Sequence, residues 1–146
     1  MKKIFKIDAA LYVLGVLTLI TGFIFHIVGH GNNFHVWVRC AYIHSIISIS
    51  FVIMLIQHLA THAGWLKSLK NIKHRQKRSV KITCFLGLLT ILVTVSGLSL
   101  LAIKGGNTPL GIWHYKLGIV FAIFVIGHAV KRFHILRKAI KNKIKA

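Results

Sequence analysis

The chain has 146 residues, of which 55% are hydrophobic, with a mean hydropathy of +0.72 and a formal net charge of +19. That hydrophobic fraction is above the range of ordinary soluble domains, which disfavours a water-soluble protein. The positive charge arises from 20 Lys and Arg residues against a single acid, Asp8. The basic tracts lack interleaved aromatic residues, which argues against nucleic-acid binding.

Four nearly uncharged stretches are each long enough to cross a bilayer, which takes roughly 20 apolar residues in a helix. We expect helices at about 8–30, 40–64, 80–103 and 111–133. Their short connections predict one all-α domain over 1–146, an integral membrane four-helix bundle with up-down-up-down topology. The first stretch follows Lys2, Lys3 and Lys6 but is too long for a signal peptide and lacks its cleavage site, so we interpret it as a retained anchor.

The first helix has His26 and His30 one turn apart at its far end, and His35 follows in the connection. These side chains are candidates to bind a quinone or a haem propionate, although interfacial histidines are often simply solvated. Trp37, Trp65 and Trp113 all lie near predicted span ends, where tryptophan anchors helices at the interface. Cys40 lies near the start of the second helix and Cys84 near the start of the third, at opposite membrane interfaces, which excludes a disulfide between them.

The second helix contains HSIISISFVIMLIQH, with His44 and His58 fourteen residues apart. Fourteen residues cover about 21 Å and nearly four whole turns of an α-helix, so both histidines lie on almost the same face near opposite interfaces. His62, one turn beyond His58, is an alternative to it. Histidine inside a membrane span is costly without a partner, so a functional role is the default interpretation.

The connection that follows, KSLKNIKHRQKRSVK, is strongly basic, and so is the C-terminal segment KRFHILRKAIKNKIKA. The other two connections have only Arg39 and Lys104. By the positive-inside rule this asymmetry predicts a multi-pass membrane protein with both termini cytoplasmic. The basic segments are also candidates to contact anionic membrane lipid.

The fourth helix repeats the second at a constant offset: HYKLGIVFAIFVIGH places His114 against His44 and His128 against His58. This correspondence indicates a duplicated helical hairpin. Because the second and fourth helices are parallel, His44 and His114 share the outer level, and His58 and His128 share the inner level.

Small residues lie beside the proposed sites. Ser48 and Gly118, one turn inward of the outer histidines, leave room for a porphyrin. For Gly15, Gly22, Gly29, Gly87 and Gly97, helix packing is the preferred explanation.

Two imidazoles from facing helices can ligate one haem iron from both sides, so the sequence predicts two b-type haems. With both axial positions filled by histidine, the expected function is electron transfer. The single acid argues against a proton pump or cation transporter, whose relays normally use intramembrane Asp or Glu. A zinc or copper path is a weaker fit because the histidines come in pairs. The alternatives are a histidine-lined metal or haem transporter and a haem-free membrane anchor subunit of a larger oxidoreductase.

The paired H-x13-H segments resemble the dihaem core of cytochrome b in quinol:cytochrome c reductases. The four spans, Thr21-Gly22, Ser96-Gly97 and HLATHAGW resemble more closely a small bacterial family, the flavinylation-associated cytochromes, first catalogued as a domain of unknown function. The resemblance covers nearly the whole chain. It implies electron transfer from a membrane quinol or a cytoplasmic donor to an extracytoplasmic acceptor, often a flavin-carrying protein, by a component of an oxidoreductase. His44, His58, His114 and His128 carry over as iron ligands.

A second resemblance, to the cytochrome b subunits of bacterial formate dehydrogenase and hydrogenase, makes His26 a competitor of His44. Long cationic side chains near the interfaces are candidates to pair with haem propionates, or are ordinary interfacial anchors. These are Arg39, Lys104 and Lys116 at the outer level, and Lys67 and Arg132 at the inner level.

Overall fold

The computed structural model describes residues 2–29, 31, 33–62, 64, 77–103 and 108–144, and nearly all of them are helical. The helices are α1 (Lys2–Gly29), α2 (Phe34–Thr61), α4 (Lys77–Leu101) and α5 (Pro109–Ile144). Each contains an apolar span long enough to cross a bilayer: Phe5–Gly29, Phe34–Thr61, Val80–Leu101 and Pro109–Lys131. The predicted all-α class and four-helix membrane bundle are therefore confirmed.

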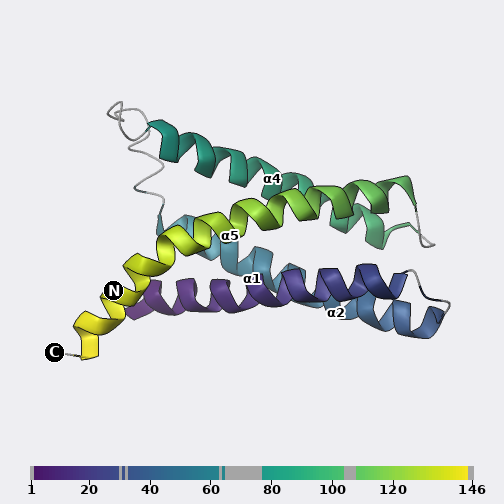
Figure 1. The fold of residues 1–146 in the computed structure, drawn as a ribbon, viewed down its shortest axis with the longest axis horizontal. Helices are drawn as coiled ribbons and strands as arrows, with labels where there is room; N and C mark the ends of the chain where they lie inside the picture. Colours follow the sequence, from purple (N-terminus) through teal and green to yellow (C-terminus); the bar gives the residue numbers. More distant parts are fainter. Residues whose placement is uncertain are drawn as a thin grey trace.

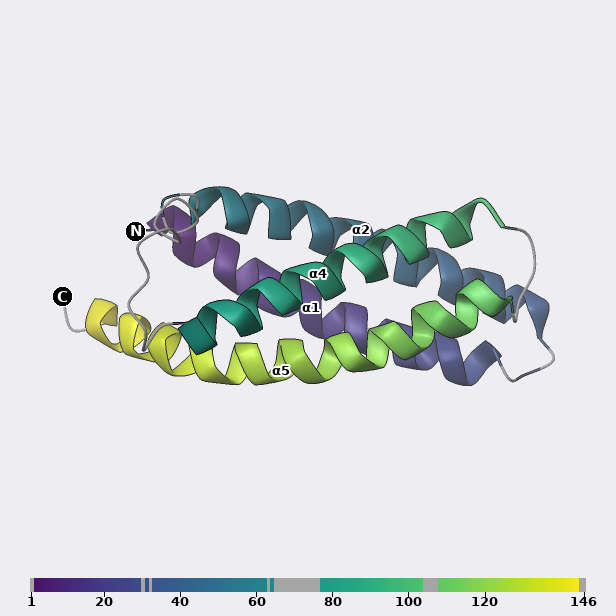
Figure 2. The same ribbon diagram turned by 90° about the horizontal axis from the view of Figure 1, so that it is seen from above.

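The helices pack as two hairpins, α1 with α2 and α4 with α5, and α1 also contacts α5 (Figures 1 and 2). In both views α1 ends and α2 begins at the same end of the bundle where α4 ends and α5 begins. We call this the outer end, and the end where α1 begins the inner end. The last turns of α5 lie toward the inner end, so the start of α1 and the end of α5 share one side of the bundle.

Local capping explains two helix starts. Asn33 precedes α2 in an extended conformation and its Oδ1 accepts a hydrogen bond from the Val36 backbone N–H at 3.2 Å. Thr108 does the same for α5, where its Oγ1 accepts from the Gly111 N–H at 3.1 Å and Pro109 occupies the first helical position. The Asn33 cap lets α2 begin at Phe34, before the expected start at residue 40. The basic tract after the last span continues α5 as a helix to Ile144, past the expected end at residue 133.

The described side chains bury little apolar surface against one another. Phe51, Leu89 and Phe121 form the central cluster, and the Phe51 and Phe121 rings meet edge to face with centroids 6.3 Å apart. By contrast, large apolar side chains point outward along every helix, for example Phe23 at 64% exposed and Ile123 at 65%. Backbone polar groups are satisfied within the helices, so this apolar exterior suits contact with lipid.

Five hydroxyl side chains inside the spans are satisfied by their own helices. The hydroxyls of Thr21, Ser50, Thr90, Ser96 and Ser99 each donate to the carbonyl four residues earlier, at 2.8 to 2.9 Å. This back-bonding is the usual way in which a helix satisfies a hydroxyl without water. A hydroxyl that donates in this way keeps its oxygen available as an acceptor for another helix.

Reporter fusions test the arrangement of the helix ends. A reporter fused after Gly31 and one fused after Thr108 should fall on the same side of the membrane, opposite to a fusion after Ile144. By the positive-inside rule, the Ile144 fusion is expected in the cytoplasm. A phosphatase and fluorescent-protein pair reports the side directly, and a cytoplasmic Thr108 fusion would contradict the topology.

Candidate functional site

His44 and His114 meet across the boundary between the two hairpins. Their ring centroids are 6.4 Å apart, and the ring planes are inclined at 70°. Both side chains are half-buried, one on α2 and the other on α5. The structure therefore brings together the two residues that the repeat placed at the outer level, and we call them the outer pair.

Each histidine of the outer pair is held by a hydroxyl from the other helix of its own hairpin. Thr21 Oγ1 lies 3.1 Å from Nδ1 of His44, and Ser96 Oγ lies 2.9 Å from Nδ1 of His114. Both hydroxyls donate their one proton to a backbone carbonyl of their own helix, Leu17 and Leu92 respectively. The hydroxyl oxygens must then accept from Nδ1–H, which leaves Nε2 as the ring nitrogen with a free lone pair.

A glycine beside each hydroxyl makes space for the ring. A Cβ on Gly22 would lie 3.0 Å from Cε1 of His44, and a Cβ on Gly97 would lie 3.0 Å from Cε1 of His114. The corresponding distances to Nδ1 are 3.5 Å in both hairpins. The two hairpins thus share one structural motif: a hydroxyl residue followed by a glycine in the first helix, both of which contact a histidine of the second helix. For these two glycines the packing partner is the histidine itself.

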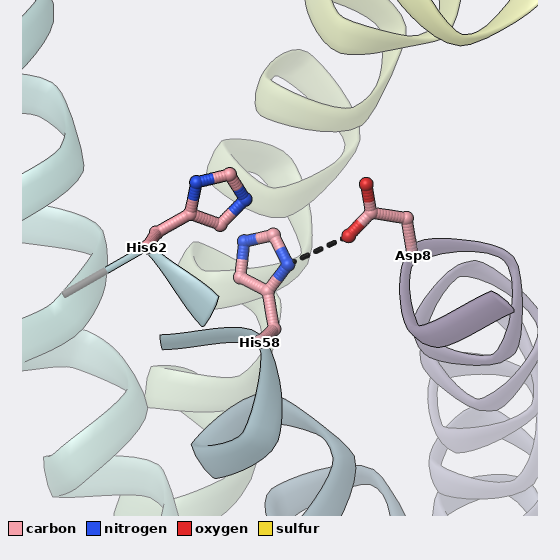
Figure 3. Close-up of side chains that lie close together, drawn as sticks. All are labelled: Asp8, His58 and His62. Atoms are coloured by element: carbon pink, nitrogen blue, oxygen red, sulfur yellow. Dashed lines mark hydrogen bonds and ion pairs between the residues drawn. The ribbon is translucent and has the colours of Figure 1, made fainter. Parts of the chain in front are cut away.

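At the inner end, His58 contacts the only acidic residue of the sequence. Its Nδ1 lies 2.8 Å from Oδ1 of Asp8 on α1, and both side chains are 26% exposed (Figure 3). His62, exposed at the C-terminal cap of α2, has its ring centroid 4.6 Å from that of His58. One potential ligand atom from each of Asp8, His58 and His62 lies within 4.8 Å of the others, close enough to hold a metal ion.

The remaining candidates take different places. His128 lies half-buried on α5, and its pairing with His58 stays a prediction. His26 stacks on Tyr115 with centroids 3.7 Å apart, so it lies at the contact between α1 and α5. Arg39 is exposed on α2, and the exposed Lys116 lies with its ammonium 5.5 Å from the ring centroid of Trp113. The described residues do not include Lys67 and Lys104, nor the side chain of Arg132.

Sequence reasoning did not assign the partners of the histidines. Thr21-Gly22 and Ser96-Gly97 were singled out only as part of a resemblance, and Asp8 only as a charge. A second repeat in the sequence would have found them, because Thr21 and Ser96 correspond at an offset larger than the offset between His44 and His114. The two offsets differ because the helices of the first hairpin extend further beyond the site before they connect: Thr21 and His44 are 23 positions apart, whereas Ser96 and His114 are 18 positions apart.

Comparisons with protein-family models, curated proteins and solved structures found no match. The site is therefore defined by its own geometry, within a four-pass membrane protein.

The glycines beside the outer pair give a stability prediction. Gly97→Ala forces its Cβ against His114 and should lower the free energy of unfolding by about 1–3 kcal/mol, the usual cost of overpacking. Gly87→Ala is the matched control in the same helix, because nothing lies within 4 Å of its Cβ position. It should stabilise by about 0.5–1 kcal/mol through helix propensity. Thermal unfolding in detergent measures both, and equal Tm values would show that the close contact is unimportant.

Proposed function

We propose that this chain binds two b-type haems, each between two histidines, and transfers electrons across the membrane. The observation that carries the proposal is the outer pair: two parallel helices present two half-buried imidazoles to each other, and each has its Nδ1 fixed. Such second-layer hydrogen bonds are the usual support of a histidine that ligates a metal, since they set the tautomer and the ring orientation.

The spacing of the outer pair fits one iron. A metal–imidazole bond of about 2.0–2.1 Å, with about 1.1 Å from nitrogen to ring centroid, puts the two centroids about 6.3 Å apart when the bonds are collinear. The centroids of His44 and His114 are 6.4 Å apart. Edge-to-face packing of two rings covers a wider range, about 4.5–7 Å, which includes this separation. The pair thus has the separation that bis-histidine ligation needs, without movement of either helix.

The surroundings also have space and unused polar groups. Gly118 on α5 has nothing within 4 Å of its Cβ position. The hydroxyls of Thr18 and Ser48 are buried and lack a hydrogen-bond partner among the described residues. Both lie one turn inward of the outer pair, Thr18 before Thr21 on α1 and Ser48 after His44 on α2. A bound haem would offer hydrogen-bonding groups only at its propionates, so these hydroxyls would be satisfied only where a propionate reaches them.

The inner haem would be held by His58 and His128, fourteen residues along the same two helices. The two levels are about 21 Å apart along the axis. Halfway between them, seven residues from each level, the Phe51 and Phe121 rings contact each other in the core. A bound haem iron would supply one-electron redox chemistry, and with two of these histidines as its protein ligands it would offer no open position to a substrate. The chain is therefore proposed as an electron-transfer component and not as a complete enzyme.

The partners follow from the resemblance to flavinylation-associated cytochromes. A membrane quinol or a cytoplasmic donor would deliver electrons to the inner level, and an extracytoplasmic protein, carrying flavin, would accept them at the outer level. The outer pair lies near the outer ends of α1 and α4, where a docked protein can approach. The proposal accordingly puts the chain in the bacterial cytoplasmic membrane with the inner end in the cytoplasm, the orientation that the positive-inside rule predicts.

One observation favours a different function. Asp8, His58 and His62 could together hold a divalent metal ion, with two imidazoles and one carboxylate as ligands. That arrangement would suit an entry site for a metal transporter. Metal analysis separates the two proposals: a stoichiometric zinc or copper content in purified protein without haem would favour the metal path.

Haem stoichiometry tests the main proposal. Purified protein should bind two haems per chain, measured by pyridine haemochrome against amino-acid analysis. His44→Ala and His114→Ala should each remove the outer haem and retain most of the inner one. Tyr42→Ala is the matched control, because Tyr42 is exposed on the same helix as His44, and it should retain both. Folded wild-type protein that binds no haem when supplied with it would refute the proposal.

Electron transfer across proteoliposomes tests the function directly. Reductant confined to the side of the inner end should reduce an impermeant acceptor on the other side. His58→Ala and His44→Ala should each abolish the transfer, because either change removes one of two haems in series. Tyr42→Ala should leave the rate unchanged. Wild-type rates in both haem-ligand variants would exclude the proposed path, even with haem present.

A further inference from the structure

Asp8 is the only acidic residue in a chain with 20 basic ones, and it lies within the first apolar span. Its carboxylate oxygen is 2.8 Å from Nδ1 of His58, and Figure 3 shows the two side chains pointing toward each other from α1 and α2. An ionised carboxylate only accepts hydrogen bonds, so Nδ1 of His58 carries the proton and Nε2 keeps its lone pair. A carboxylate in a membrane span is costly and marks a functional site by default.

The hairpin repeat shows that this position is equivalent to those of the hydroxyls. Ser96 follows Thr21 by the same number of positions as Thr83 follows Asp8. Likewise, His128 follows His58 by the same number of positions as His114 follows His44. The four positions on α1 and α4 that correspond in this way therefore hold Thr21, Ser96, Thr83 and Asp8. Three have a hydroxyl, and one has a carboxylate. The single acid of the sequence replaces a hydroxyl at the position that contacts an inner histidine.

We propose that Asp8 is a positioning residue for the inner haem: it fixes His58 with Nε2 toward the iron, strengthens that nitrogen as a donor, and lowers the reduction potential of the inner haem. This inference rests on the proposed function. A carboxylate that accepts from a ligating imidazole raises the basicity of the ligand, more than a neutral hydroxyl does. Its negative charge also favours the oxidised iron, with weak screening because the pair is three-quarters buried.

The difference between the two levels gives a direction to electron flow. At the outer level both histidines are held by neutral hydroxyls, from Thr21 and Ser96. At the inner level one histidine is held by a carboxylate. The inner haem is then the stronger reductant of the two as far as these contacts decide it, so electrons move downhill from the inner end to the outer end. The presence of Asp8 in one hairpin, where the other has Thr83, therefore favours electron transfer from the inner end to the outer end.

The experiment uses the His114→Ala protein, in which only the inner haem remains, so that its midpoint potential is measured alone by spectroelectrochemical titration. In this background Asp8→Thr reproduces the equivalent Thr83 and should shift the midpoint potential upward, whereas Asp8→Glu should restore a low value. Lys6→Gln is the matched control, since Lys6 is exposed two residues away, and it should produce no upward shift. An unchanged potential in Asp8→Thr with haem retained would overturn the inference and leave the proposed function standing.

Haem binding and tautomer state give independent readouts. Asp8→Ala should weaken binding of the inner haem about 10- to 100-fold, the usual effect of removing a partner of a metal ligand. In haem-free protein, nitrogen-15 NMR of histidine should show His58 protonated at Nδ1 in the wild type and a tautomer mixture in Asp8→Ala. Identical spectra would overturn the positioning role. Wild-type protein that binds no haem would instead refute the proposed function, so the two failures are distinguishable.

Discussion

The main constraint on this structure is that a histidine inside a membrane bundle needs a hydrogen-bond partner that holds its neutral ring in one orientation. In lipid, a histidine ring must satisfy its N–H within the protein, and the outer pair does so with hydroxyls whose own protons are committed to helix carbonyls. The direction of these hydrogen bonds is therefore fixed: the hydroxyl donates to the backbone carbonyl, and the Nδ1–H of the ring donates to the hydroxyl oxygen. Nε2 is left as the reactive nitrogen on both rings. Gly22 and Gly97 let the first helix approach closely enough for this to occur.

The repeated hairpin explains why the two rings meet. Each hairpin fixes its own histidine internally, through contacts between α1 and α2 or between α4 and α5, so the facing rings need few contacts to each other. The interface between hairpins is correspondingly sparse. It includes the Phe51 and Phe121 rings at its centre, a hydrogen bond from the Tyr12 hydroxyl to the Ala129 carbonyl at 2.9 Å, and His26 stacked on Tyr115. The two hairpins therefore share only a thin core.

The sequence predicted the four helices and the meeting of His44 with His114, because apolar length and the period of the helix determine both. It did not predict the partners of the histidines. The hydrogen bonds of Thr21, Ser96 and Asp8 depend on how each helix is rotated about its axis relative to its neighbour, which composition does not specify. His62 lies beside His58 because residues four apart on a helix are neighbours, as the spacing that made it an alternative ligand already implied. The pairing of His58 with His128 and the haems themselves stay predictions.

Locating the iron itself is the most direct test of the central claim that the outer pair ligates haem. Anomalous diffraction at the iron edge, from crystals of the purified protein, reports iron positions without assuming their ligands. We predict one peak between Nε2 of His44 and Nε2 of His114, about 2.0–2.1 Å from each, and a second at the level of His58 and His128. An occupied iron site away from the outer pair, with the two rings still in contact across the hairpins, would contradict the claim.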